Sequence, residues 1–215
     1  SSISSGWHCK IVLTEDTDGS DQGMGQKVNI DFGSGNDVVG GGAGGDTRSG
    51  GTGDDTLYGG SGSDTIVAQH WNNGSVIVTE TGSNNIWAGD GDDIVYGANG
   101  NDMLGGGLGN DNITGADGAD TIFAGKSGND TVDGGGGNDK VYGGSGNDSV
   151  SGGAGNDELY GGSGVDVVLG GDGTDTLYGG GGNDTIDGGA GDDTLHGGSG
   201  NDLLRPGAGS DVLIF

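Results

Sequence analysis

The sequence predicts an all-β fold in which the chain winds into a solenoid of stacked parallel strands. Three observations predict it: after Phe32 an Asp recurs with a nine-residue period, glycines precede it at fixed positions, and a large aliphatic residue follows two positions later. Residues 179–187 give a clean copy of the pattern G-G-x-G-x-D-x-U-x, in which U is the aliphatic residue and the positions are numbered 1 to 9. A short period that persists over most of a chain is typical of repeat architectures.

The first 32 residues lie outside this pattern. Trp7 to Leu13 and Lys27 to Phe32 predict two strands, and Thr14 to Gln26 predicts a polar loop between them. The open end of a solenoid core normally needs a cover. We therefore interpret residues 1–32 as a non-repetitive β segment that caps the solenoid.

The repeats form two blocks of unequal length. The first block covers residues 33–67, and the second covers residues 84–215. Residues 68–83 break the pattern between them, where Ser75 to Val78 suggests a strand. This insertion is either two poor repeats or a protruding loop, and both interpretations stay open on the sequence.

Three residues depart from the pattern inside the blocks. Arg48 occupies a U position and weakens the repeat there. Ser127 is an extra residue, because the neighbouring aspartates are ten residues apart, and it predicts a bulge near residues 125–128. Asn84 replaces the Asp of a degenerate repeat, which puts in doubt any ligand that depends on that Asp.

Each nonapeptide predicts one turn and one short strand. Glycines at positions 1, 2 and 4 permit positive φ and close backbone approach, so G-G-x-G-x-D predicts a turn. The three residues x-U-x predict a strand whose middle side chain points inward. Two nonapeptides then form one coil of about 18 residues, and stacked coils enclose a thin core of U residues between two sheets. Asn at position 5 is expected to hydrogen-bond within its own turn.

The aspartates at position 6 are the candidate metal ligands. Turns one coil apart lie above one another, so their carboxylates lie across one gap. Ca²⁺ takes six to eight oxygen ligands from carboxylates and carbonyls, and paired turns supply both kinds. The eighteen position-6 residues are Asp37, Asp46, Asp55, Asp64, Asp93, Asp102, Asp111, Asp120, Asp130, Asp139, Asp148, Asp157, Asp166, Asp175, Asp184, Asp193, Asp202 and Asp211.

Composition and charge favour a fold that depends on bound cations. The chain has 59 Gly and only 28% hydrophobic residues, too little apolar surface to offset the backbone entropy lost on folding. Two Asp pairs in the first block and twelve in the second make fourteen, so one doubly charged ion per pair would bring +28 against a formal charge of −27. We therefore predict a chain that is expanded without Ca²⁺ and compact with up to about fourteen ions bound.

The same composition argues against several function classes. Six Lys and Arg among 33 Asp and Glu exclude nucleic acid as a partner, and no apolar run approaches the length of a membrane span. The three His are widely separated, and no hydrolase motif is present, so we predict no catalytic residue and no enzymatic activity. A single Cys predicts no disulfide framework.

The nonapeptides of residues 33–215 resemble those of the RTX (repeats-in-toxin) calcium-binding family. The resemblance implies a right-handed parallel β-roll, a β-solenoid with two nonapeptide repeats per coil and Ca²⁺ ions between stacked turns. It also implies that the position-6 aspartates and neighbouring turn carbonyls are the ligands. Members of the family are typically exported by Gram-negative bacteria through type I secretion, which implies a secreted or cell-surface protein that folds on binding Ca²⁺ outside the cell.

One row of outward side chains is unusually regular. All five Tyr occupy position 9, and three of them are 18 residues apart. The spacing predicts that one sheet carries an aligned stripe of Phe123, Tyr142, Tyr160, Tyr178 and His196, followed by Ile214. Two interpretations are open: a ladder that stiffens its own sheet, or a lateral binding stripe for an extracellular glycan or a second copy of the chain.

Two roles are compatible with these features. The first is an extracellular structural or adhesive protein that assembles end to end through its solenoid. The alternative is the C-terminal folding and secretion module of a larger RTX protease, lipase, epimerase or toxin. Ice binding is a minor alternative, because the outward Thr176 and Thr194 align with Glu158 and Lys140 rather than with further threonines.

Overall fold

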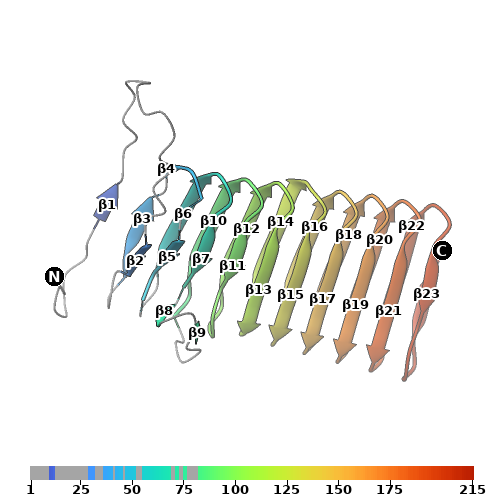
Figure 1. Cartoon of the computed structure of the whole chain (residues 1–215). Coiled ribbons are helices and arrows are strands. Elements are labelled where there is room, and N and C mark those ends of the chain that lie inside the picture. The colour runs from blue at the N-terminus through green and yellow to red at the C-terminus, as the bar shows by residue number, and fades with distance from the viewer. Residues whose placement is uncertain are drawn as a thin grey trace.

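The described part of the chain is a long β-solenoid (Figure 1). The computed structural model of the 215-residue chain describes residues 10–12, 29–31, 36–40, 42–45, 47–51, 55–68, 71–72, 75–76 and 82–215. Within these residues every regular element is a β-strand, and the strands of the two large sheets pair in parallel. The predicted all-β solenoid is therefore confirmed.

One large sheet, here the first sheet, has twelve strands. These are β1 (Lys10–Val12), β3 (Val38–Gly40), β4 (Gly42–Ala43), β6 (Thr56–Ser61), β10 (Asn85–Asp90), β12 (Met103–Leu108), β14 (Thr121–Ser127), β16 (Lys140–Ser145), β18 (Glu158–Ser163), β20 (Thr176–Gly181), β22 (Thr194–Ser199) and β24 (Val212–Ile214).

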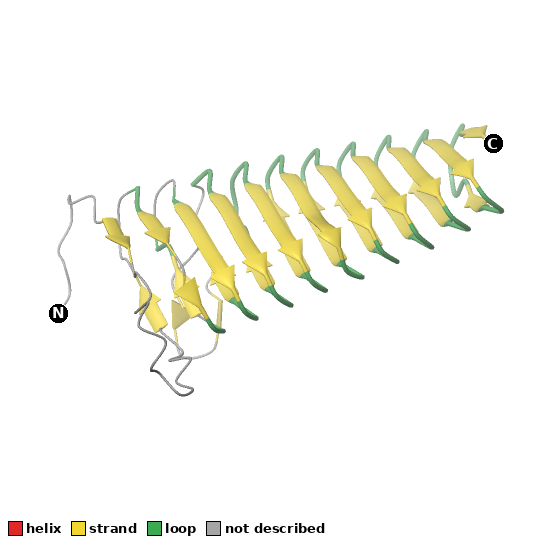
Figure 2. Cartoon of the chain, turned by 90° about the horizontal axis from the view of Figure 1, so that it is seen from above, coloured by secondary structure: helices red, strands yellow, loops and turns green. Residues whose placement is uncertain are grey.

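The facing second sheet has ten strands. These are β2 (Asn29–Asp31), β5 (Thr47–Ser49), β7 (Thr65–Val67), β11 (Ile94–Tyr96), β13 (Asn112–Asp117), β15 (Thr131–Gly136), β17 (Ser149–Ala154), β19 (Val167–Asp172), β21 (Thr185–Ala190) and β23 (Leu203–Arg205). From β10 onward successive strands alternate between the sheets, so each coil of two nonapeptides gives one strand to each sheet. The turns line up along both long edges of the solenoid (Figure 2).

From β12 to β22 the strands have six or seven residues, about twice the three that the sequence predicts. Strand β16 contains not only Lys140, Val141 and Tyr142 but also the next three residues, which pair with β18 as Gly144 to Gly162 and Ser145 to Ser163. Glycine has a weak strand preference, but here the N–H and C=O groups of each coil are paired with the coils on either side. The turn is thus confined to positions 4 to 6, where glycines such as Gly146 (φ 136°) take the positive φ that other residues avoid.

The core is a single layer of side chains between the sheets. U residues such as Val141, Leu159 and Val150 are fully buried, as the pattern predicts. Position 1 also faces inward, and its residue is small: Ala88 and Ala124 are fully buried there, and Gly takes this place in most other coils. The third inward residue of each nonapeptide is the Asp at position 6, so the thin core ends in a carboxylate at both edges.

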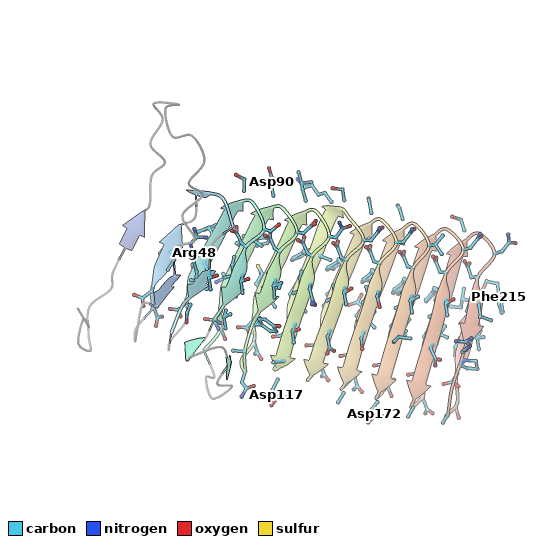
Figure 3. The ribbon with its side chains drawn as sticks, in the orientation of Figure 1. Arg48, Asp90, Asp117, Asp172 and Phe215 are labelled. Carbon is cyan, nitrogen blue, oxygen red and sulfur yellow. The ribbon has the colours of Figure 1, made fainter. Side chains whose placement is uncertain are left out.

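Arg48 is accommodated inside this core. Its side chain is 1% exposed, and its Nη1 donates hydrogen bonds to the carbonyl oxygens of Tyr58 (3.3 Å) and Gly59 (3.0 Å) on β6. A buried guanidinium requires such acceptors. The departure at this U position therefore places a fixed cation across the two sheets near the N-terminal end (Figure 3).

The described strands of the insertion between the two repeat blocks lie outside both large sheets. The strands before and after it pair directly, with Leu57 opposite Ile86 and Ile66 opposite Val95. Within the inserted segment, β8 (Trp71–Asn72) and β9 (Ser75–Val76) form a separate antiparallel pair. The described strands of the segment thus lie apart from the stacked repeats, and its interpretation as a protruding loop stays a prediction.

Strands were predicted on both sides of the N-terminal polar loop, and the structure has one in each place. Strand β1 pairs with β3 and β2 pairs with β5, both in parallel, so they begin the two sheets. The loop from 14 to 26 lies outside the described residues. The capping role of residues 1–32 stays a prediction.

The expected bulge is present. Gly107 pairs with Gly125 and Leu108 pairs with Ser127, so the register shifts by one residue within the predicted range. The residue left over is Lys126, not Ser127 as the sequence suggested. Spacing alone could not show this, because leaving out either Lys126 or Ser127 restores the nine-residue period.

Candidate metal centres

The position-6 residues form two columns, one along each edge of the solenoid. The first column contains Asp37, Asp55, Asn84, Asp102, Asp120, Asp139, Asp157, Asp175, Asp193 and Asp211. The second contains Asp64, Asp93, Asp111, Asp130, Asp148, Asp166, Asp184 and Asp202. Asp46 lies outside the described residues.

One carboxylate oxygen of each Asp ties adjacent coils together. The backbone N–H of Asp130 donates to Oδ1 of Asp148 at 2.9 Å, and that of Asp148 donates to Oδ1 of Asp166 at 2.9 Å. The same bond recurs along both columns with lengths of 2.6 to 3.0 Å. Each carboxylate is therefore held in place by the coil before it, with its other oxygen turned to the interior.

That other oxygen, Oδ2, is buried and accepts no hydrogen bond in eleven of the position-6 aspartates. These are Asp93, Asp111, Asp120, Asp130, Asp139, Asp148, Asp157, Asp166, Asp175, Asp184 and Asp193. Buried polar atoms almost always have a partner, and a buried anion costs more than a neutral group. A row of such oxygens indicates that a cation completes the structure.

A backbone carbonyl oxygen converges on most of these carboxylates, those whose own repeat has Gly at position 1. A methyl group added to Gly161 would lie 2.7 Å from Oδ2 of Asp166 and 2.8 Å from the carbonyl oxygen of Gly179. The same pair of oxygens, one from a carboxylate and one from the position-1 carbonyl of the next coil, surrounds Gly134. The absence of a side chain at position 1 thus leaves a small cradle lined by oxygen.

Electrostatics show the cost of leaving these carboxylates without a cation. Burial, the largest cause, raises the pKa of Asp111 and Asp120 from 3.8 to about 7, although backbone N–H donors lower it in part. Burial likewise raises the pKa of six others to about 6: Asp93, Asp130, Asp139, Asp157, Asp166 and Asp175. Neighbouring carboxylates of the same column contribute a smaller increase in most of these.

The donor set fits a hard divalent cation. Among the described residues no three acidic, His or Cys side chains converge on one point, so most ligands of such an ion would have to be backbone carbonyls. Carbonyl and carboxylate oxygens in large number are what Ca²⁺ accepts, whereas Zn²⁺ prefers nitrogen and sulfur. The residues present therefore fit Ca²⁺ between successive coils.

The structure also shows aspartate pairing across the insertion. The N–H of Asp64 donates to Oδ1 of Asp93 although the two residues are 29 apart. In the other column Asn84 takes the place of an Asp: its Oδ1 accepts from Asp55 N–H at 2.9 Å, and its Nδ2 donates to Oδ1 of Asp102 at 3.1 Å. The amide thus supplies a positive hydrogen-bond edge where the other coils have only oxygen. The doubt about calcium beside Asn84 stays a prediction.

The expectation for Asn at position 5 was wrong. These amides do not bond within their own turn but accept from the next coil: Asn147 N–H donates to Oδ1 of Asn129, and Val165 N–H to Oδ1 of Asn147, both at 2.8 Å. The direction is opposite to that of the Asp column. The stacking of turns creates this acceptor geometry, and a single turn considered alone does not contain it.

The outward row at position 9 is aligned as the spacing predicts. The rings of Phe123, Tyr142, Tyr160, Tyr178 and His196 stack with centroids 4.4 to 5.1 Å apart. Lys140 supports this row: its Nζ lies 2.7 Å from Glu158 and 5.7 Å from the centre of the Tyr142 ring.

The predicted stripe left out two aromatic residues of this face, Tyr58 and Trp87, which lie opposite one another on β6 and β10. Trp87 is the one next to the stripe. Its ring lies 6.2 Å from Phe123, across a coil that contributes only Gly105. Because Gly105 interrupts the row, Trp87 and Phe123 are two coils apart, and the sequence did not show that they share one row. The binding role of the stripe stays a prediction.

Comparison with known families points to the same chemistry. A family model described as RTX calcium-binding nonapeptide repeat (4 copies) matches residues 40–69, 72–104, 105–127, 123–150, 142–177 and 178–213. A search of curated proteins finds no match. In the described part of the chain, no helix is long and apolar enough to cross a membrane.

Proposed function

Because the chain belongs to the RTX calcium-binding nonapeptide repeat family, we propose that it is a structural protein whose solenoid is held together by Ca²⁺ between its coils. The observation that carries this proposal is the row of buried Oδ2 atoms without a hydrogen-bond partner, such as those of Asp139, Asp148 and Asp157. When bound, Ca²⁺ supplies the positive charge that these carboxylates lack. No catalytic role is assigned to the repeats.

The ligands would be the position-6 carboxylates and the position-1 carbonyls of the next coil. Fourteen Asp–Asp contacts occur in the described columns, counting the one across the insertion and leaving out the two made by Asn84. Up to about fourteen ions would therefore neutralise a chain whose formal charge is −27. Without them the same charge opposes stacking of the coils.

Such a protein would fold where Ca²⁺ is abundant. Extracellular modules typically bind Ca²⁺ at about 10⁻⁴ to 10⁻³ M, far above cytosolic concentrations. We accordingly propose secretion by a Gram-negative bacterium through type I export, with folding outside the cell. The support for this location is the family alone.

We further propose that calcium-loaded copies associate end to end. The support for this is the way the repeats stack: each coil adds one parallel strand to each sheet, so coils of a second copy would extend both sheets in the same way. Sedimentation of the chain with and without Ca²⁺ tests this role: a strict monomer at millimolar calcium would contradict association and leave calcium binding untouched.

A calcium titration followed by circular dichroism tests the main proposal. We expect β-structure to appear cooperatively as Ca²⁺ is added and to disappear on chelation, because the ion and the folded state require one another. A chelated chain that stays rich in β-structure and resists proteolysis would overturn it.

Asp148→Asn and Asp133→Asn form a matched pair for this titration. Both remove one negative charge, but Asp148 is buried in a column whereas Asp133 is exposed on β15. We expect Asp148→Asn to raise the calcium midpoint several-fold and to lower the bound calcium by one or two ions, and Asp133→Asn to change neither measurably. Equal effects of the two variants would mean that overall charge, not the columns, controls folding.

A further inference from the structure

The outer face of the first sheet contains a cavity that the repeat pattern does not account for. It has a volume of about 690 Å³ and is lined chiefly by Trp87, Asp90, Gly105, Leu108, Phe123 and Lys126. These residues belong to β10, β12 and β14, which are adjacent in the sheet. The volume falls in the range of small-molecule binding sites.

The two walls of the cavity are formed by different rows of the sheet. One wall is the aromatic row at position 9, in which Gly105 separates Trp87 from Phe123. The indole of Trp87 leans over this glycine, because a methyl group added there would collide with the ring. The floor is the row of position-2 glycines, which present bare backbone.

The other wall consists of Asp90, Leu108 and Lys126. In the later coils the equivalent row contains only small residues, since Ser145 lies beside Ser163 and Gly181 beside Ser199. Asp90 projects from the edge of the sheet in Figure 3, and Lys126 is the extra residue of the bulge. Side chains here deepen a groove that is shallow elsewhere.

Four departures from the repeat therefore meet at one place: the missing aromatic at Gly105, the large residues Asp90 and Leu108, and the inserted Lys126. A ladder that only stiffens its sheet would gain from a ring in every coil. Here the stack is interrupted instead, with Trp87 and Phe123 6.2 Å apart against 4.4 to 5.1 Å in the continuous part. The interruption and the added wall both enlarge the cavity.

We propose that this cavity binds neutral hexose units of a glycan. The C–H face of a sugar ring is apolar and packs on Trp87, Phe123 and the side chain of Leu108, which is 44% exposed. The ring hydroxyls require an acceptor and a donor, which Asp90 and Lys126 supply. The lining contains one acidic and one basic side chain, Asp90 and Lys126, so it offers no net positive charge to an acidic sugar, and the ligand is an uncharged one.

The cavity exists only when the coils are stacked, so this proposal rests on the calcium-dependent fold. Calorimetry of the full chain in millimolar calcium tests it, with cellohexaose, mannohexaose and maltohexaose as probes. We expect saturable binding of at least one of them. Circular dichroism of the same samples separates the two proposals. A chain without β-structure in calcium would contradict the calcium-dependent fold, whereas a folded chain that binds none of the probes would contradict the glycan site alone.

Two variants and one control locate the site. Trp87→Ala removes one wall, and Gly105→Tyr places a second ring where the Trp87 indole now leans over the glycine and so displaces that wall. Each is therefore expected to weaken binding by about tenfold or more. Tyr178→Ala removes an aromatic of the same row outside the cavity and is expected to leave binding unchanged. Equal losses in all three variants would assign binding to the whole stripe and overturn the cavity.

A competing occupant is a second copy of the chain. Sedimentation of wild type and Trp87→Ala at the same calcium concentration distinguishes it. A dimer that Trp87→Ala dissociates, together with no sugar binding by the wild type, would show that the cavity is a contact between copies and would overturn the proposal. A calcium-loaded chain whose association state is the same in both variants, with sugar binding lost only in the variant, supports it.

Discussion

The two oxygens of each position-6 aspartate have separate roles at the scale of single residues. Oδ1 accepts the N–H of the preceding coil, and Oδ2 faces a carbonyl oxygen across the position-1 cradle. One side chain thus makes a hydrogen bond between coils with Oδ1 and presents a negatively charged oxygen without a partner with Oδ2. Asn can replace the first role but not the second, and Asn84 shows that replacement within the chain.

Glycine at position 4 is the residue whose replacement we expect to be most damaging. Gly182 has φ 146°, and a methyl group there would coincide with the carbonyl oxygen of Gly164 in the preceding coil. Positive φ costs an ordinary residue about 1–3 kcal/mol before any steric clash is counted. Gly182→Ala is therefore expected to raise the calcium midpoint for folding strongly, as measured by circular dichroism.

Gly181→Ala is the control for that variant. It adds the same methyl group one residue earlier, where the backbone does not take a positive φ and the nearest atom is Oγ of Ser199 at 3.4 Å. We expect Gly181→Ala to leave the calcium midpoint for folding nearly unchanged, because surface substitutions usually change the free energy of unfolding by no more than about 0.5 kcal/mol. If both variants shift equally, the backbone conformation at position 4 is not the cause.

Strands and turns were predictable at the scale of elements, but their bounds were not. The inward U residues, the turn glycines and the bulge near 125–128 follow from spacing, because a period of nine fixes which side chains face the core. The six-residue strands did not follow, since two consecutive glycines form a strand only when neighbouring coils pair with them. The forward hydrogen bonds of Asn129 and Asn147 were missed for the same reason.

The columns of buried carboxylates predict opposite effects of pH with and without calcium. In the calcium-free folded chain, burial raises the pKa of Asp111 and Asp120 from 3.8 to about 7. A raised folded-state pKa means that stability is fully present below the ordinary value and is lost as pH rises through about 7. Calcium-stripped chain should therefore gain β-structure on acidification from pH 8 toward pH 4.

Calcium-loaded chain should behave in the opposite way, because protons compete with the ion for the same carboxylates. Circular dichroism over pH 4 to 8, with and without calcium, checks both directions. The pH range of the calcium-free series is informative, because the raised pKa values of the buried columns place the gain in stability between about 7 and the ordinary Asp value of about 3.9. A calcium-free chain that gains β-structure as the pH rises would contradict the role of the columns.

The position of the insertion is a property of the whole molecule. Residues 64 and 93 are adjacent in one column although 29 residues separate them, so the solenoid continues across a segment that the sequence treated as a break between blocks. Spacing fixed the register on either side but could not show that the two registers join. The cavity beside Trp87 and Phe123 was hidden for a related reason, since its walls come from three coils that the pattern describes one at a time.

Calcium should change the size of the whole molecule. An unfolded chain of this length has an expected radius of gyration of about 50 Å, whereas some ten coils stacked at about 4.8 Å form a short rod with a value of roughly 20 Å. Small-angle scattering of the chelated chain and of the chain in millimolar Ca²⁺ is expected to give these two values.

Potassium chloride at high concentration screens the −27 charge and should shrink the chelated chain only in part, without β-structure in circular dichroism. Mg²⁺ at the same concentration as Ca²⁺ should also fall short, because it retains its waters and demands a tighter octahedral shell than these carbonyls offer. Full compaction by Mg²⁺ or by salt alone would show that charge neutralisation is sufficient and that the oxygen cradles do not select the ion.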